Sequence, residues 1–327
     1  MTVIEGETMR QMSATLLNLV FYLWLIALGA GIGAKALRGI RMVWLSRLQM
    51  AVLFMIILSL GIQLGANEEV AESVGIIGLA ALISALLAMA GSLLFGYLLR
   101  RFLLKLDRFG SAGGESGTEA DSGGSADTRL TWVILAAVIV GAFLGRAVLP
   151  EAVTRRCAPA VSLGLDVMLF LVGLDLGVQG ESIRSMIRDA GARPLLLPLA
   201  VVAGSLSFGA LTALVLPFSP RETAAVAAGM GWYSLAPSIL APYSLKLSAI
   251  AFLSNIIREL LSILLVPFVA RRIGYLESVA IAGATAMDTL LPVILKAADR
   301  RITVYAFTSG LVCSLLVPVL VPLMIAF

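Results

Sequence analysis

Ten apolar segments, most of them about 20 residues long, occupy nearly all of this 327-residue chain. A helix needs about 20 residues to cross the hydrocarbon core of a bilayer. Hydrophobic residues make up 60% of the sequence and charged residues 13%, about half the charge of a soluble domain. We therefore expect an all-α polytopic membrane protein in contact with the lipid bilayer. The segments are Ser13–Leu37, Leu48–Ala66, Val74–Leu99, Leu130–Leu149, Ala160–Val178, Pro194–Pro217, Thr223–Tyr243, Lys246–Ala270, Leu276–Leu295 and Ile302–Phe327.

Several classes of function are disfavoured by composition. The sequence contains no His, the commonest metal ligand and general base. Cys157 and Cys313 lie far apart and form no CxxC pattern, so we expect buried thiols rather than a disulfide or redox centre. The net charge of +4 comes from basic residues in short loops, where they act as topology signals. We predict no metal site, no cofactor and no nucleic-acid partner.

Two of the ten segments are poor candidates for simple crossings. The seventh is broken at Gly229, Gly231 and Pro237, and the ninth at Gly283 and Pro292. Non-helical backbone at membrane depth is tolerated only inside protein or beside a water-filled cavity. We predict two re-entrant or discontinuous helical segments; the alternative is a pair of ordinary kinked spans.

The distribution of Lys and Arg favours eight transmembrane helices plus the two re-entrant segments, with both termini outside the inner membrane. In this topology most of the 24 basic residues lie on the cytoplasmic side, as the positive-inside rule requires. Ten full crossings would place Arg271 and Arg272 outside. The inner residues would be Lys35, Arg38, Arg41, Arg47, Arg100, Arg101, Lys105, Arg108, Arg129, Arg184, Arg188, Arg193, Arg271, Arg272, Lys296, Arg300 and Arg301.

An internal repeat points to a transporter. Gly61-Ile-Gln-Leu-Gly65 recurs as Gly173-Leu-Asp-Leu-Gly177, each near the end of the second helix of a three-helix unit. Three crossings make the second copy inverted, and inverted repeats with broken helices are typical of secondary transporters. The predicted units are an N-terminal tail (1–12), a first three-helix repeat (13–99), a flexible cytoplasmic linker (100–129), a second, inverted repeat (130–217), a hairpin plus helix (223–270) and its inverted counterpart (276–327).

The strongest candidate site residues lie near the middle of the eighth segment. Arg258 and Glu259 are adjacent, so on a helix they point in different directions and cannot neutralise each other. Asn255 lies at helical spacing from Glu259 on a polar stripe. An ionisable group at this depth costs about 2.5–3.5 kcal/mol. Glu259 is therefore predicted to bind substrate or coupling ion; a buried ion pair that fixes helix register is the alternative.

The two broken segments contribute further candidates. Asp288 follows Thr285 in the second break, where a carboxylate is either a helix cap or a cation ligand. Trp232, Tyr233 and Ser234 occupy the first break. The faces of these aromatic rings can hold an ammonium group, although Trp and Tyr are also common interface anchors.

The sign of the intramembrane charge indicates the class of substrate. Glu259, Asp288 and Glu68 face a single Arg258. We expect a cationic substrate whose one carboxylate is bound by the guanidinium fork. Glu68 ends the second segment; it is either an exposed loop carboxylate or a group that gathers cations at the outer mouth.

Four stretches resemble the bacterial lysine exporter (LysO-type) family, within the superfamily of cation:proton antiporters and anion transporters. The resemblance is clear over 223–327 and looser over the first six segments, where 61–69 fits best. The stretches are Gly231-Trp-Tyr-Ser-Leu235, Ser254-Asn-Ile-Ile-Arg-Glu259, Gly283-Ala-Thr-Ala-Met-Asp288-Thr-Leu-Leu-Pro292 and Ser314-Leu-Leu-Val-Pro-Val-Leu-Val-Pro322.

This resemblance implies export of lysine and its analogue thialysine, with eight crossings and both ends outside. The family's two important acids fall on Glu259 and on Glu68, where Asp is usual. The sequence departs from the family at Ala236-Pro237, which replaces Ser-Gly, and at Ala286, which replaces Ser. Both departures lie at the predicted hairpin tips and bear on substrate identity.

The expected mechanism is alternating access, with the hairpins and their following helices moving against the first six. Outward movement of a monocation costs about 2.3 kcal/mol per 100 mV, so export requires influx of H⁺ or Na⁺ as coupling ion. The alternatives are an ion-coupled transporter of another small zwitterion or organic anion, and a membrane-embedded enzyme, which the mid-span polar residues disfavour. A homodimer is expected only by analogy with other transporters.

Overall fold

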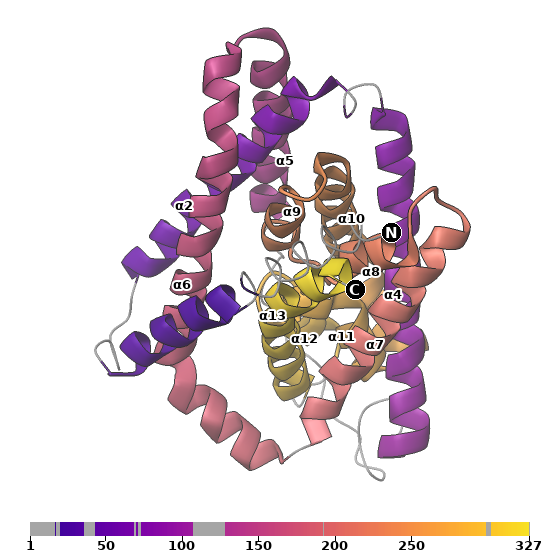
Figure 1. The fold of residues 1–327 in the computed structure, drawn as a ribbon. Helices are drawn as coiled ribbons and strands as arrows, with labels where there is room; N and C mark the ends of the chain where they lie inside the picture. The colour runs from indigo at the N-terminus through magenta and orange to yellow at the C-terminus, as the bar shows by residue number, and fades with distance from the viewer. Residues whose placement is uncertain are drawn as a thin grey trace, which may run out of the picture.

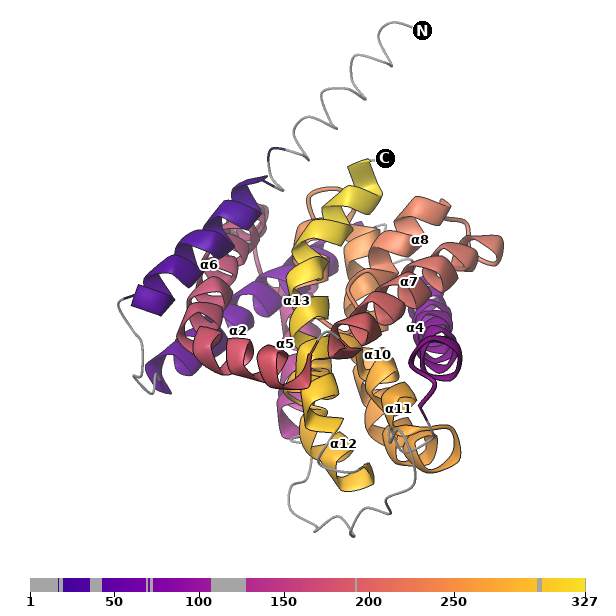
Figure 2. The ribbon, with the colours of Figure 1, turned by 90° about the horizontal axis from the view of Figure 1, so that it is seen from below.

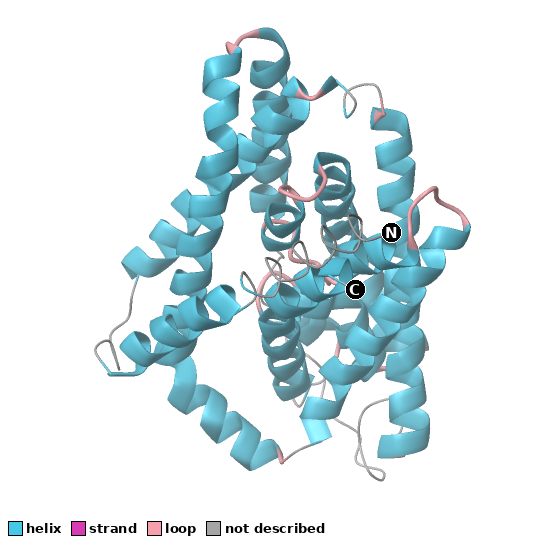
Figure 3. Ribbon diagram, in the orientation of Figure 1, coloured by secondary structure: helices cyan, strands magenta, loops and turns pink. Residues whose placement is uncertain are grey.

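The computed structural model describes residues 17, 20–35, 43–68, 70, 73–106, 128–191, 193–298 and 302–326. The regular structure within them is helical throughout (Figure 3). The predicted tail 1–12 lies outside the described residues, as does most of the predicted linker. The helices are 20–35, α2 (Val43–Ala66), α4 (Val74–Leu98), α5 (Thr128–Ala147), α6 (Glu151–Ala190), α7 (Leu196–Leu211), α8 (Pro220–Ala227), α9 (Leu235–Leu240), α10 (Leu245–Arg272), α11 (Tyr275–Ala282), α12 (Leu291–Ala297) and α13 (Ile302–Ala326).

The polytopic character predicted from composition is supported by helix length. Six described helices, in α2, α4, α6, α7, α10 and α13, are long and apolar enough to cross a membrane. Two shorter apolar helices, Val20–Lys35 and Ala136–Ala147, occupy the other segments predicted to cross. The chain therefore has the helices of an integral membrane protein.

Two element boundaries differ from the sequence-based expectation. The fifth segment, predicted as Ala160–Val178, is the middle of a 40-residue helix, α6. Its polar ends carry no hydrophobic signal but are rich in residues that favour helix. Residues 99–104 continue α4 as a π-helix, η1 (Leu99–Leu104), and α5 begins at Thr128. The helices thus extend into both ends of the predicted linker 100–129.

The helices form two lobes that touch each other sparsely. Helix 20–35, α2, α5 and α6 make one lobe, which we call the glycine-packed lobe, on the left of Figures 1 and 2. The hairpin lobe contains α4, α7 and α8 to α13, with α10 at its centre. The third helix of each predicted repeat, α4 or α7, therefore packs with the broken segments rather than with the two helices before it.

Close glycine contacts hold the first lobe together. A Cβ atom on Gly65 of α2 would lie 2.0 Å from the carbonyl oxygen of Ala142 in α5, and one on Gly177 of α6 would lie 2.2 Å from that of Ala30. Small residues allow helix backbones to approach this closely in membranes. Glycines 61 and 65 of α2 face glycines 141 and 145 of α5, and glycines 173 and 177 of α6 face glycines 29 and 33 of the first helix. Each of these glycines in the first predicted repeat has its equivalent in the second repeat at the same distance along the sequence.

The same pattern recurs at the centre of the hairpin lobe. A Cβ on Gly91 of α4 would lie 2.2 Å from the carbonyl oxygen of Gly204 in α7, and the reciprocal contact is 2.3 Å. The next residues, Ser92 and Ser205, share a hydrogen bond of 2.8 Å. The third helices of the two predicted repeats thus meet each other through glycine, whereas the first helix of each repeat meets the second helix of the other.

Both predicted interruptions are present. The first separates α8 from α9, and the second, which includes the 3-10 turn η4 (Gly283–Met287), separates α11 from α12. The first segment begins and ends near the same end of α10, because Lys246 Nζ lies 5.9 Å from the centroid of the Phe218 ring. The second follows the opposite end of α10, where α11 packs antiparallel to it.

We predict that Gly33→Ala destabilises the protein while Gly31→Ala on the same helix does not. A Cβ at Gly33 would lie 2.2 Å from the Leu174 carbonyl oxygen, whereas nothing lies within 4 Å of one at Gly31. Overpacking costs about 1–3 kcal/mol, and alanine in an open helical position gains roughly 0.5–1 kcal/mol. Thermal unfolding midpoints in detergent measure the difference. Equal midpoints for the two variants would contradict the close packing.

Candidate functional site

The two broken segments meet beside the middle of α10. The Ala284 N–H in the second break donates to the carbonyl oxygen of Met230 in the first (2.9 Å). The Gly231 N–H donates to Asn255 Oδ1 of α10 (2.6 Å). Each unsatisfied backbone group in a bilayer costs several kcal/mol, and these bonds satisfy groups freed by the breaks.

The tips of the breaks use unusual backbone conformations. Gly231 has a φ of 103° and Gly283 a φ of 65°, both in the region that favours glycine. Met230 adopts a φ of 47° although it carries a side chain, which is uncommon. A Cβ on Gly283 would lie 2.4 Å from the Met230 carbonyl oxygen, so glycine is required for the tips to touch. Strained backbone of this kind clusters at functional sites.

Arg258 is a structural centre of the hairpin lobe. Its side chain is buried, with 2% of the residue exposed, and it has no carboxylate partner among the described residues. Nη1 donates to Ser205 Oγ and Nη2 to Ser92 Oγ, each at 3.0 Å. Nε donates to the Ile281 carbonyl oxygen (3.1 Å) and Nη2 also to that of Ala280 (3.4 Å). These carbonyls end α11, where the helix dipole favours a positive charge.

Most of the polar residues of α10 form hydrogen bonds with the backbone of the broken segments, as Arg258 does. Ser248 Oγ donates to the Pro237 carbonyl oxygen (2.8 Å), and Ser262 Oγ to that of Ile281 (3.1 Å). Together with Asn255 and Arg258, they fix both segments to α10. The polar stripe predicted from the sequence is therefore largely structural.

Glu259 is the exception. The residue is 1% exposed, and neither carboxylate oxygen has a hydrogen-bond partner in the described part of the chain. Tyr233, Asp288 and Thr289 are close enough to interact with it. The hydroxyl of neighbouring Thr289 donates to Asp288 Oδ1 (3.1 Å). A buried carboxylate with no donor must be protonated or bind a cation, because a bare charge at this depth is too costly.

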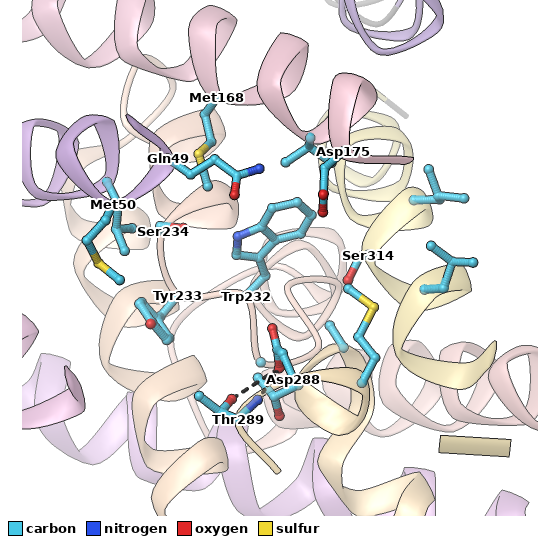
Figure 4. Close-up of a pocket in the computed structure, with 18 of the residues that line it drawn as sticks. Gln49, Met50, Met168, Asp175, Trp232, Tyr233, Ser234, Asp288, Thr289 and Ser314 are labelled. Atoms are coloured by element: carbon cyan, nitrogen blue, oxygen red, sulfur yellow. Dashed lines mark hydrogen bonds between the residues drawn. The ribbon is translucent and has the colours of Figure 1, made fainter. Parts of the chain in front are cut away.

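A cavity of about 390 Å³ lies at the boundary of the two lobes (Figure 4). Figure 4 shows the Trp232 indole projecting into the cavity towards Gln49 and Asp175, with Asp288 on the other side. The cavity contains carboxylates but no Lys or Arg among the residues that line it. The lining comprises Gln49, Met50 and Leu53 of α2; Met168, Val172 and Asp175 of α6; Gly231 to Ser234, Ala284, Thr285 and Met287 to Thr289 of the breaks; and Phe307, Leu311, Ser314 and Leu315 of α13.

The structure brings together five of the predicted site residues: Trp232, Tyr233, Ser234, Thr285 and Asp288 all line the cavity. Glu259 lies behind Tyr233, Asp288 and Thr289 rather than in the cavity wall. Asn255 and Arg258 support the tips from the other side.

Glu68 lies away from this group. Its side chain is 83% exposed, and its carboxylate is 3.6 Å from the guanidinium of Arg146. This contact matches the alternative of an exposed loop carboxylate. An ion pair this exposed contributes little to stability.

Sequence reasoning placed neither Gln49 nor Asp175 in the site. Asp175 does carry a signal in the sequence, because it is an acid inside the second copy of the glycine repeat, where it is either a loop carboxylate or a cation-gathering group. Gln49 carries no such signal, since a single amide near the start of a helix is common.

The chain is similar to a known family of transporters. Residues 135–325 match the family model described as lysine exporter LysO. The chain is 31% identical over 185 residues to "Lysine exporter LysO" of Escherichia coli K12, which covers 56% of this chain and 60% of that protein. It is 31% identical over 157 residues to "Putative lysine exporter" of Haemophilus influenzae, covering 48% and 79%. The match thus spans less than two thirds of the Escherichia coli relative. No solved structure gives a significant match.

We predict that Arg258→Lys destabilises the fold although it keeps the charge. A single ammonium cannot reach two serines on different helices and the α11 carbonyls together, and each hydrogen bond to a charged group contributes about 1.5–3 kcal/mol. The expected loss is about 2 kcal/mol or more, measured by thermal unfolding in detergent. Arg155→Lys, at an exposed ion pair with Glu151, is the control. An unchanged midpoint for Arg258→Lys would contradict the structural role.

Proposed function

Because the chain belongs to the lysine exporter LysO family, we propose that it is a secondary active transporter that exports L-lysine, and analogues such as thialysine, across the inner membrane. The observation that carries this proposal is the cavity between the lobes. Asp175 and Asp288 line it, and no Lys or Arg does so among the described residues. Such a site suits a substrate that bears ammonium groups.

The aromatic and neutral groups fit the rest of a lysine molecule. The Trp232 ring can contact an ammonium group through its face or the aliphatic stem by apolar packing. Arg258 does not line the cavity, and four of its five N–H groups already donate to protein groups. We therefore assign the substrate carboxylate to neutral donors in the cavity wall, among them Gln49, Ser234 and Ser314.

The departures from the family pattern do not favour another substrate. Ala236 and Ala286 are fully buried, and neither they nor Pro237 lines the cavity. They pack behind the tips: Ala236 lies against the position of Gly229. The substitutions therefore alter the support of the hairpins rather than the surface that meets a solute, and lysine is preferred over another zwitterion or organic anion.

Glu259 is the proposed exchange site for the coupling ion. Export of a monocation against a negative interior costs about 2.3 kcal/mol per 100 mV, so H⁺ or Na⁺ influx must drive it. A buried carboxylate without a hydrogen-bond donor can take either ion. Tyr233, Asp288 and Thr289 line the cavity and also lie near Glu259, so a shift of these side chains would connect it with the substrate.

Alternating access is proposed to move the hairpin lobe against the glycine-packed lobe. The lobes touch sparsely and the cavity lies between them. This division assigns α4 and α7 to the same body as the broken segments, which differs from the division expected from the sequence. The constant offset of the glycine contacts and the Ser92–Ser205 pair supports two inverted repeats related through the centre of the hairpin lobe.

We further propose eight crossings and two re-entrant segments, with both termini outside and a fold of the cation:proton antiporter type. The Phe218–Lys246 contact supports the re-entrant course of the first segment, since its two ends lie together.

We predict that proteoliposomes preloaded with labelled lysine release it when an inward H⁺ or Na⁺ gradient is imposed. Glu259→Gln should abolish the gradient-dependent release, because the amide can neither exchange a proton nor bind the ammonium as an ion pair. Glu222→Gln, at the exposed capping box of α8, keeps the cap and is the matched control.

Two outcomes of this assay are informative in different ways. Lysine release from Glu259→Gln at the wild-type rate would remove that residue from the mechanism. The absence of lysine movement in the wild type under either gradient would overturn lysine as the substrate.

A further inference from the structure

The transport cavity offers a charged partner to an ammonium group but none to a carboxylate. Asp288 lines the cavity, and no Lys or Arg does so among the described residues. Arg258 lies outside its wall and donates to the hydroxyls of Ser92 and Ser205 and to carbonyls of α11. A carboxylate that leaves water needs an opposite charge to offset the cost of its desolvation. The carboxylate is thus the least well matched part of a lysine molecule in this cavity.

Asp288 is held in place as a partner for an ammonium group. Its Oδ1 accepts the backbone N–H of Thr289 (2.6 Å) and the hydroxyl of the same residue (3.1 Å). Both of these bonds use one oxygen, so Oδ2 is left for a ligand. Figure 4 shows the Trp232 indole projecting into the cavity with Asp288 on its other side. A cation that contacts both a carboxylate and the face of an aromatic ring is stabilised by each of them.

Much of the cavity wall is apolar and suits a chain of methylene groups. Contact between such a chain and apolar side chains removes both from water and requires no hydrogen bond. Methionine adapts its shape to a flexible chain. The apolar side chains that helices contribute to the wall include Met50 and Leu53 of α2, Met168 and Val172 of α6, and Leu311 and Leu315 of α13.

The neutral polar groups of the cavity do not require a carboxylate. Gln49, Ser234 and Ser314 can donate hydrogen bonds to one, but they cannot offset its charge as Lys or Arg would. Gln49 Nε2 also donates to the Leu171 carbonyl oxygen (3.4 Å). Amide and hydroxyl groups contain oxygens that accept hydrogen bonds, so the same side chains can receive the N–H groups of an ammonium. They are therefore compatible with either group of a ligand.

We propose that the cavity also takes aliphatic diamines as substrates, among them the five-carbon diamine that remains when lysine loses its carboxylate. This inference rests on the proposed function, because it takes the cavity to be the substrate site. The diamine keeps both ammonium groups and the methylene chain. It avoids the cost of bringing a carboxylate out of water without a cation beside it. Norleucine, which keeps the carboxylate and lacks the terminal ammonium, is the opposite case and should bind poorly.

The test is isothermal titration of lysine, the five-carbon diamine and norleucine into the purified full chain. The diamine should bind within about tenfold of lysine, because only hydrogen bonds to neutral donors are lost. Norleucine should bind at least about tenfold more weakly than either, because it loses a charged contact. Asp288→Asn keeps an oxygen for the Thr289 bonds and should weaken lysine and diamine alike, whereas Glu222→Gln, at the exposed capping box of α8, should change neither.

A second variant separates the two substrates on one protein. Gln49→Glu places a negative charge in the cavity wall, where it repels a carboxylate and attracts an ammonium. The ratio of lysine affinity to diamine affinity should fall by about tenfold or more, since like charges repel strongly in a site of low dielectric constant. Both ligands are measured on the same sample, so a loss of folded protein would leave this ratio unchanged. An unchanged ratio would contradict the weak role of the substrate carboxylate.

Transport of the diamine follows from release of the labelled compound from preloaded proteoliposomes under the gradient that drives lysine. Binding and release of lysine with no binding of the diamine would overturn this inference and leave the proposed function intact. Binding and release of the diamine without lysine would support the inference and overturn lysine as the substrate. A diamine that binds but is not released would be an inhibitor, which would contradict its place among the substrates.

Discussion

The fold depends on how freed backbone groups are satisfied inside a membrane. Two helical segments are interrupted beside the middle of α10, where the peptide groups of the breaks are largely buried in protein. These peptide groups form hydrogen bonds with each other and with side chains of α10. Ala284 donates to the Met230 carbonyl, Gly231 donates to Asn255, and Arg258 donates to the carbonyls that end α11. The long helix α10 thus supplies the polar side chains that hydrogen-bond to both breaks, and the rest of the hairpin lobe packs around it.

This arrangement explains why adjacent charged residues have different roles. Arg258 points towards Ser92 and Ser205, at the glycine contact between α4 and α7, and has almost no bonding capacity left for a ligand. Glu259 points to the other side, towards Tyr233, Asp288 and Thr289, and neither of its carboxylate oxygens makes a hydrogen bond within the described part of the chain. A carboxylate that costs free energy to bury and has no hydrogen bond among the described residues supports the proposal that it binds a ligand or an ion.

Much of this organisation could be predicted from the sequence, because it follows from composition and from backbone chemistry. Glycine and proline marked both breaks, and the rarity of acids in apolar segments singled out Glu259 and Asp288. The direction of Arg258 could not be predicted, since it depends on Ser92 and Ser205, which are far away in the chain. The packing of α4 and α7 in the hairpin lobe could not be predicted either, because the composition of an apolar helix does not show which other helices it contacts. Gln49 enters the cavity only through tertiary packing.

The central claim is that the unpartnered carboxylate of Glu259 takes part in binding the substrate ammonium. Isothermal titration of lysine into the purified protein tests it most directly, because binding is measured without transport or a gradient. The account predicts that lysine binds to the wild type and to Glu222→Gln with the same affinity, and at least about tenfold more weakly to Glu259→Gln, the change expected for a loss of about 1.4 kcal/mol. Equal lysine affinity in the wild type and Glu259→Gln would contradict it.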